Sequence, residues 1–128
     1  MPIKTNGTAG HISMQDPTIR QIIDGMPSRF HAEAAGDVDV VLQFHLSGPQ
    51  GCDFYAAIAD RACEVFDGIH PSPTCTMKMS DETYVDMVMC RLTGQQAFFT
   101  RKLRYEGPIT LAIRLHRFFQ STAVLTPA

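Results

Sequence analysis

Residues 38–48 read VDVVLQFHLSG, and their pattern is the clearest β-strand signal in the chain. Apolar side chains alternate onto one face, and the other face carries Asp39, Gln43 and His45. Because successive side chains of a strand point to opposite faces of a sheet, the apolar face packs on a core. The alternating apolar residues are Val38, Val40, Leu42, Phe44 and Leu46. The stretch predicts a strand whose polar face meets solvent.

Four further segments predict strands that extend this sheet. They are 53–60, 63–66, 74–79 and 102–106. The turn GPQG at 48–51 joins the first two strands as a hairpin. Met77 and Met79 alternate with polar residues in the fourth strand, and Leu103 and Tyr105 are directed inward in the fifth.

Two helices are predicted before the first strand. Asp16 and Pro17 are residue types that favour the N-cap and the first position of a helix, and apolar residues follow at helical spacing. Pro27 is expected to break this helix. A second, short helix is expected between Ser28 as its cap and Gly36 as its terminator.

Three helical segments are predicted around the fifth strand. Ser80 is a suitable N-cap for the first, and a short helical turn is expected at 95–100. The last apolar run, 108–121, alternates like a strand but also carries a polar stripe at helical spacing. Its 14 residues are long for a strand, so we predict a helix.

The chain has 128 residues, which is enough for one domain with a substantial core but not for two. Residues 1–15 are polar and aperiodic, so we expect a flexible N-terminal arm there and a single domain at 16–128. Strands and helices in this order predict an α+β fold, in which helices cover the apolar face of one sheet.

Charge is divided unevenly along the chain. Residues 1–90 carry five basic and twelve acidic residues, a net charge of −7, and residues 91–128 carry six basic and one acidic, a net charge of +5. Five positive charges are too few for a dedicated nucleic-acid surface. They are enough to favour docking on an anionic partner or membrane surface.

Several features predict a cytoplasmic protein with reduced thiols. The N-terminus lacks the apolar region of a secretory signal, and no apolar run reaches the length of a membrane span. The C-terminus lacks a peroxisomal signal. No CxxC pair is present, which argues against a zinc knuckle. The cysteines are Cys52, Cys63, Cys75 and Cys90.

No common catalytic or nucleotide-binding motif is present in the sequence. His45 falls on the strand face that points away from the core, and no cysteine has a neighbouring histidine or lysine that would activate its thiol. The helix dipole and solvation account for Asp81, Glu82 and Asp86. We therefore expect no catalysis, no metal ion and no cofactor.

Two groups of apolar residues are unusual for a chain of this size. Methionines gather in the fourth strand and the helix after it, and phenylalanines gather near the C-terminal end. These residues are Met77, Met79, Met87, Met89, Phe98, Phe99, Phe118 and Phe119. Methionine is flexible and polarizable, so it suits surfaces that adapt to variable apolar ligands. Residue types alone leave ordinary core packing and an adaptable binding surface both open.

From Val38 to Phe119 the chain resembles the sterol carrier protein 2 (SCP-2) domain family, whose members are small lipid-binding proteins. The resemblance rests on VVLQFHLSG with its hairpin, on PSPTCTMKMSDETYVDMV, and on LTGQQAFFTRKLRYEGPITLAIRL. MPSRFHAEAAG is similar to the leading helices of the family. Family members usually carry glycine at the positions of Cys90 and Arg101, so side chains there are expected to reshape the pocket mouth.

The resemblance implies a five-stranded mixed sheet in the order 3-2-1-4-5, with an apolar tunnel between the sheet and the helices. The residues that would bind lipid there are Phe44, Met77, Met79, Tyr84, Met87, Val88, Phe98, Phe99, Leu103, Tyr105, Leu111, Leu115, Phe118 and Phe119. Arg101, Lys102 and Arg104 would point outward and serve for surface docking.

The implied function of this single SCP-2-like domain is non-catalytic binding and transfer of a sterol, a fatty-acyl chain or a similar apolar lipid. Burial of apolar ligand surface, at about 25 cal/mol per Å², would offset its removal from a membrane. Two alternatives stay open: an accessory module that presents a lipid-like intermediate to a partner enzyme, and a small enzyme that uses His45 or a cysteine. Transient contact with an anionic membrane or a partner enzyme is expected, and contact with nucleic acid is not.

Overall fold

The computed structural model describes residues 16–115 and 117, so the predicted arm at 1–15 lies outside the described residues. The elements, in chain order, are α1 (Ile19–Arg29), α2 (Ala32–Ala35), β1 (Val40–Ser47), β2 (Cys52–Ala59), β3 (Ala62–Asp67), β4 (Cys75–Ser80), α3 (Asp81–Val88), α4 (Gly94–Phe99), β5 (Leu103–Glu106) and α5 (Ile109–Leu115). The strands lie within a few residues of their predicted bounds, and the segment after β5 is helical, as predicted.

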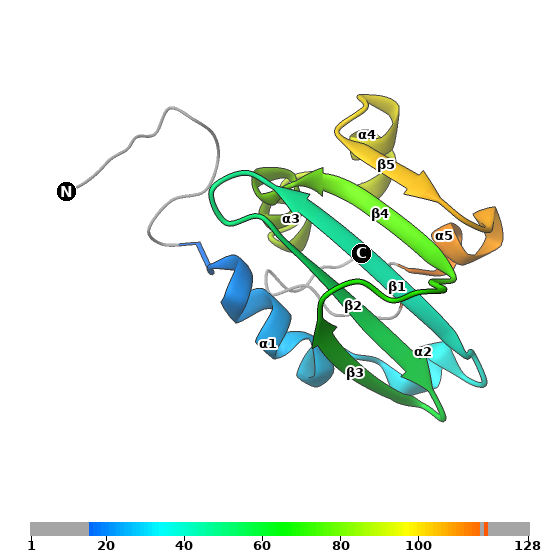
Figure 1. The fold of residues 1–128 in the computed structure, drawn as a ribbon. Coiled ribbons are helices and arrows are strands. Elements are labelled where there is room, and N and C mark those ends of the chain that lie inside the picture. Colours follow the sequence, from blue (N-terminus) through cyan, green and yellow to red (C-terminus); the bar gives the residue numbers. More distant parts are fainter. Residues whose placement is uncertain (1–15, 116, 118–128) are drawn as a thin grey trace.

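The strands form one mixed sheet in the order β3-β2-β1-β4-β5 (Figure 1). β1 runs parallel to β4, and the other neighbouring pairs are antiparallel. Phe44 in β1 lies opposite Phe54 in β2 and Met77 in β4, and Met77 lies opposite Tyr105 in β5. The α+β class and the strand order are confirmed, and this register places predicted lining residues in one row across the sheet.

The helices lie behind the sheet in Figure 1, which therefore shows the uncovered face of the sheet. The structure confirms the alternation predicted in β1 and β4. Apolar residues of both strands are buried and face the core: Leu42, Phe44, Met77 and Met79. None of the described helices is both long and apolar enough to cross a membrane.

The start of α1 differs from the prediction. Thr18, rather than Asp16, is the N-cap, and it forms a capping box with Gln21 in which each side chain accepts a hydrogen bond from the backbone N–H of the other. This box satisfies two of the N–H groups that a helix start leaves unpaired. Asp16 instead forms an ion pair with Arg91 at 2.9 Å, which ties the start of the domain to the segment after α3.

Pro27 does not break α1, which continues to Arg29. A proline so close to the end of a helix removes only one hydrogen bond, and the guanidinium of Arg29 donates to the carbonyl of Ile22, about two turns earlier. Ser28 therefore does not cap α2, which begins after His31. Gly36 ends α2 in the left-handed region (φ 58°), as predicted.

The prediction that Gln43 faces solvent is wrong, because its side chain is only 1% exposed. The connection from β3 to β4 crosses the uncovered face of the sheet, since β2 and β1 lie between these strands (Figure 1). Gln43 donates to the carbonyls of Phe54 at 3.1 Å and Gly68 at 3.0 Å, and accepts from the N–H of His70 at 2.8 Å. The amide thus fastens the crossing segment to the sheet.

Solvation does not account for Asp81 and Asp86, which are 2% and 6% exposed. The carboxylate of Asp81 accepts from the N–H groups of Gln50 and Glu82, both at 2.8 Å, and so joins the β1–β2 turn to the start of α3. Asp86 accepts from Arg91 Nε at 2.9 Å. Both acids were expected on the surface, but their burial is satisfied by these partners.

Candidate functional site

The predicted lipid-binding residues fall into four groups by their place in the structure. Those in the buried core are Phe44, Met77, Met79, Tyr84, Leu103 and Leu111. Those half-buried beside it are Met87, Val88 and Tyr105. Phe98 and Phe99 are exposed. Leu115 belongs to α5 but its side chain is not described, and Phe118 and Phe119 lie outside the described residues.

One half of the layer between sheet and helices is packed by aromatic rings. Phe44 and Phe54 stack with their centroids 4.6 Å apart, and Tyr84 of α3 lies 5.6 and 6.0 Å from them. The Tyr84 hydroxyl donates to Met26 Sδ of α1 at 3.9 Å. Burial raises the pKa of Tyr84 well above its usual value, so this phenol stays neutral. We call this region, with Met26, the aromatic half.

The other half of the layer lies over β4 and β5, and we call it the methionine half. Met77 and Met79 of β4 pair with Tyr105 and Leu103 of β5, and all four face the helices. Two short helices belong to it: α4, which buries Ala97, and α5, which buries Leu111. Met87 Cε lies 3.8 Å from the position that a Cβ on Gly94 would occupy, so the end of α3 meets the start of α4.

The outer surfaces of α4 and α5 carry exposed apolar side chains. Phe98 and Phe99 are 49% and 77% exposed, and their rings meet edge to face at 5.7 Å. Ile109 and Ile113 of α5 are 67% and 60% exposed. Exposed apolar groups of this size are typical of a contact surface rather than of a core.

The connection from β5 to α5 is held at two points. The Tyr105 hydroxyl donates to the carbonyl of Pro108 at 2.7 Å. Gly107 has a φ of 144°, and a Cβ at this position would lie 2.6 Å from Cys75 Cβ and 3.0 Å from the Thr74 carbonyl oxygen. Only glycine fits so close to β4, and the approach fixes where α5 begins over the sheet.

The titratable groups of the described residues give little support for catalysis. Burial raises the pKa of the Cys63 and Cys75 thiols to about 11 and also raises that of Cys52, so the nucleophilic thiolates are disfavoured at neutral pH. His45 Nδ1 lies 2.7 Å from Asp53 on the uncovered face of the sheet, away from the apolar layer. No group of three metal-ligating side chains occurs among the described residues.

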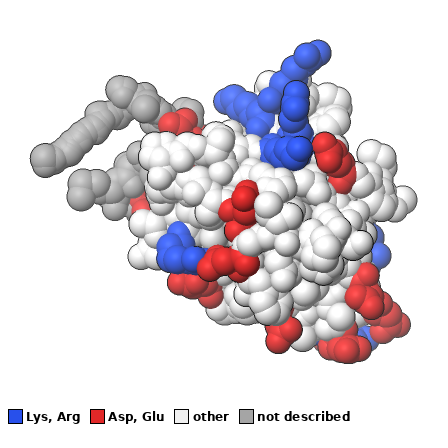
Figure 2. Space-filling view, in the orientation of Figure 1, with Lys and Arg blue, Asp and Glu red and all other residues white. Residues whose placement is uncertain are grey.

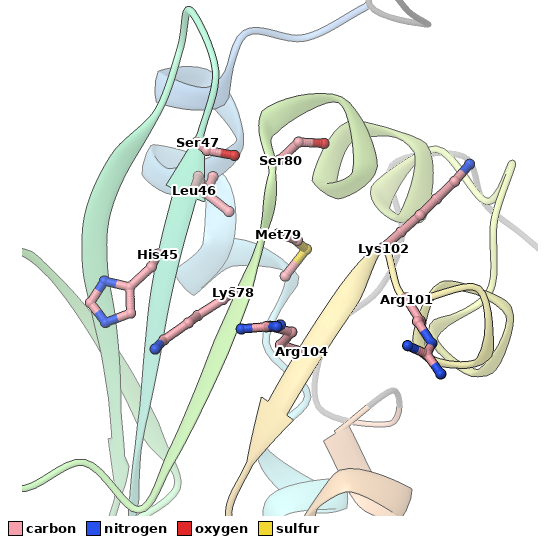
Figure 3. A pocket seen from close by; sticks show the side chains of 9 residues that line it. All are labelled: His45, Leu46, Ser47, Lys78, Met79, Ser80, Arg101, Lys102 and Arg104. Carbon is pink, nitrogen blue, oxygen red and sulfur yellow. The ribbon is translucent and has the colours of Figure 1, made fainter.

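A shallow hollow of about 410 Å³ lies on the uncovered face at the β4–β5 end (Figure 3). We call it the basic hollow; its lining is His45, Leu46, Ser47, Lys78, Met79, Ser80, Arg101, Lys102 and Arg104. In Figure 2 the lysine and arginine side chains gather at this end, and acidic residues predominate towards the other. The three predicted docking residues all line this hollow, and Lys78 joins them from β4, which no local signal in the sequence indicated.

A second hollow, of about 360 Å³, lies between α1 and β3 and is lined in part by Arg20 and Asp67, which pair at 3.1 Å. Among the described residues that were predicted to bind lipid, only Met79 lines one of these hollows, and none lines the other.

Comparison with known proteins gives one family model and several longer or similar-sized proteins that match this chain. The model of the SCP-2 sterol transfer family matches residues 19–120. The hydroxysteroid dehydrogenase-like protein 2 of Rattus norvegicus is 29% identical over 109 residues, which are 84% of this chain and 20% of that protein. The chain thus spans about a fifth of the length of the curated relatives that it matches.

Two solved structures show the same fold at low sequence identity. The sec-alkylsulfatase Pisa1 from Pseudomonas sp. superposes with a TM-score of 0.68 at 12% identity, over 91% of this chain and 20% of that one. Palmitated SCP2L2 from Aedes aegypti superposes with a TM-score of 0.60 at 19% identity, over 79% of this chain and 93% of that one.

Proposed function

The chain belongs to the SCP-2 sterol transfer family, and from this premise we propose that it binds an apolar lipid without covalent chemistry and transfers it. The ligand is a sterol, a fatty-acyl chain or a similar molecule, and its site is the methionine half of the layer between sheet and helices. The palmitate in the neighbouring structure from Aedes aegypti supports a ligand of this class.

The observation that carries the proposal is the contrast between the two halves of the layer. The aromatic half is closed by stacked rings and the 11-residue helix α1. The methionine half is covered by α4 and α5, of six and seven residues. Short helices with few buried side chains are displaced at low cost, and methionines repack easily around a new shape. This half can therefore open to the roughly 300–1,000 Å³ that a lipid needs.

A thermal-shift and fluorescence titration tests the proposal. Delipidated protein is incubated with a fluorescent fatty acid and with a sterol, and mass spectrometry identifies the ligand that copurifies under native conditions. Since a ligand that binds only the folded state stabilises it, saturation at a hundredfold excess over Kd should add about 2.7 kcal/mol to the free energy of unfolding. No thermal shift with any lipid and no copurified lipid would contradict the proposal.

A second candidate function is that of an accessory module, in which the bound lipid is presented to a separate enzyme. It is favoured by the relatives, since hydroxysteroid dehydrogenase-like protein 2 and Pisa1 are about five times longer than the matched segment. Both functions require contact with a donor membrane or a partner, for which Arg101, Lys102 and Arg104 provide exposed cations. Transfer of a fluorescent fatty acid between vesicles by the protein alone favours the carrier, and binding without transfer favours the module.

We also propose that the domain itself is non-catalytic. The raised pKa values of the buried thiols and the distance of the His45 face from the apolar layer support this. Incubation with a fluorescent acyl ester should release no product. Product that disappears in a Cys75→Ala or His45→Gln variant would instead identify a small enzyme.

A further inference from the structure

The basic hollow brings together Lys78, Arg101, Lys102 and Arg104, and among the described residues only Lys78 of these four pairs with a carboxylate. Lys78 of β4 lies directly opposite Arg104 of β5, and like charges that face each other across antiparallel strands destabilise a sheet. The side chains extend from neighbouring strands over the same part of the sheet (Figure 3). Two carboxylates contact lining residues: Glu106 lies 3.8 Å from Lys78 Nζ, and Asp53 lies 2.7 Å from His45 Nδ1. Within the described residues, Arg101, Lys102 and Arg104 form no ion pair.

The backbone supplies a second unfavourable feature at the same place. Arg101 has a φ of 66°, in the left-handed region where a residue with a Cβ is disfavoured. Arg101 N–H donates to the Phe98 carbonyl at 3.1 Å and Lys102 N–H to the Ala97 carbonyl at 2.8 Å, which is a helix C-cap that favours glycine. A bulky cation at this position costs stability and adds a charge to the hollow. Strain and charge repulsion that converge on one hollow indicate a binding function.

The third observation concerns what lies beside the hollow. The last turn of α4 exposes Phe98 and Phe99, immediately before the cations at 101 and 102. Aromatic rings next to cations suit a membrane surface, where the rings enter the interface and the cations meet anionic headgroups. Arginine in particular binds phosphate through two parallel hydrogen bonds. An acidic protein surface would explain the cations but not the exposed rings.

We propose that the basic hollow docks the protein on anionic membranes by binding headgroups of net negative charge, while Phe98 and Phe99 enter the interface beside it. This inference rests on the proposed function, since docking at α4 brings one cover of the methionine half to the bilayer from which a lipid would enter. The cationic side chains of the hollow lie on the opposite face of the sheet from the apolar layer, and Met79 is a lining residue that the hollow shares with the methionine half.

The full chain is tested by cosedimentation with two kinds of vesicle, one of phosphatidylcholine alone and one of phosphatidylcholine mixed with phosphatidylserine. Wild-type protein should bind the mixed vesicles, and added salt should weaken this binding. The Arg101→Gly variant should bind them about fivefold more weakly, which is the usual contribution of one cation near an anionic surface. Because glycine relieves the left-handed backbone, the same variant should have a raised melting temperature.

Arg61→Gly is the matched control. Arg61 also has a positive φ (61°), and it lies in the β2–β3 turn at the far end of the sheet from α4 (Figure 1). The substitution removes the same charge and the same backbone strain, so it should raise the melting temperature without weakening vesicle binding. A double variant, Lys78→Gln with Arg104→Gln, removes the facing charges and should weaken binding roughly 25-fold.

Three outcomes would overturn the proposal. These are equal vesicle binding by Arg101→Gly and Arg61→Gly, equal binding to both kinds of vesicle, and no vesicle binding by wild-type protein, which would point to an acidic protein partner instead. Binding of a fluorescent fatty acid, measured without vesicles, separates this proposal from the proposed function. Variants that keep their affinity for the fatty acid but no longer bind vesicles support the docking proposal by itself. Wild-type protein that binds vesicles but not the fatty acid leaves the docking proposal intact and contradicts the carrier function.

Discussion

The side-chain amide of Gln43 is used in full within the protein. Its NH₂ group donates to the Phe54 and Gly68 carbonyls, and its oxygen accepts from the N–H of His70. The groups at 68 and 70 belong to the connection that crosses the uncovered face of the sheet. Because one side chain satisfies these backbone groups, the crossing segment depends on it.

We expect Gln43→Met to destabilise the fold by about 2–4 kcal/mol. Methionine has a similar length but leaves the Gly68 carbonyl and the His70 N–H without their partner, and unsatisfied buried groups are costly. Urea unfolding followed by circular dichroism measures the change. Gln95→Met, on the exposed surface of α4, is the control and should change stability by about 0.5 kcal/mol or less. Equal effects of the two substitutions would contradict this account of the crossing.

The buried thiol of Cys75 and the half-buried thiol of Cys63 predict a dependence of stability on alkaline pH. Burial raises the pKa of Cys63 and Cys75 to about 11, from about 9 in an unfolded chain. Below pH 9 both states keep their protons, so the stabilising effect is fully present. Between about pH 9 and 11 only the unfolded state loses protons, so stability falls as pH rises. Urea unfolding at pH 8 and pH 10 should show the fall, and Cys75→Ala should reduce it; an unchanged pH profile would show that Cys75 does not contribute.

At the scale of elements, the β5–α5 connection lies so close to β4 that adding a single methyl group at Gly107 should destabilise the fold. Gly107→Ala places a Cβ against Cys75 and the Thr74 carbonyl in a backbone conformation that alanine resists, and should cost about 2–4 kcal/mol. Gly68→Ala is the control, since Gly68 also has a positive φ (115°) but a Cβ there would meet no atom within 4 Å. The difference between the two melting temperatures isolates the contact with β4, and no difference would mean that α5 is not held there.

Local signals predicted most elements because each has a local cause. The alternation in β1 and β4 and the serine cap of α3 depend on neighbours in the sequence. The capping box of Thr18 and Gln21 was also visible as a spacing of three, but the more familiar Asp16-Pro17 pair obscured it. The burial of Gln43 had no local signal, because it depends on a connection that crosses two strands.

At the scale of the whole molecule, the layer between sheet and helices has two halves that the sequence does not distinguish. Phe44 and Tyr84 were expected to line the same tunnel as Met77 and Met79, since all four are apolar residues on the core side. In the structure Phe44 stacks on Phe54 and Tyr84 is tilted against both rings, whereas the methionines lie toward β5. Which residues share a half depends on strand order and helix placement, and strand order entered through the family resemblance rather than through local pattern.

Met87 provides the test of whether the methionine half opens for a ligand. Its side chain is half-buried at the meeting of α3 and α4. In a close-packed core the larger ring of Met87→Trp would destabilise the fold by about 1–3 kcal/mol. Where α4 can move outward, the ring occupies space that the ligand would use. We therefore expect the ligand-free variant to keep or raise its melting temperature and to bind a fluorescent fatty acid more weakly.

Met26→Trp is the control for this substitution because Met26 is buried in the aromatic half, where its sulfur accepts the Tyr84 hydroxyl. In the aromatic half the added bulk would press against the 11-residue helix α1 and the ring stack, so it must distort one of them. We expect Met26→Trp to lower the melting temperature and to leave fatty-acid affinity unchanged in the protein that remains folded. If both tryptophans destabilise equally and neither alters binding, the two halves are one packed core and the lipid must bind elsewhere. If only Met87→Trp weakens binding, the division of the layer determines where the ligand lies.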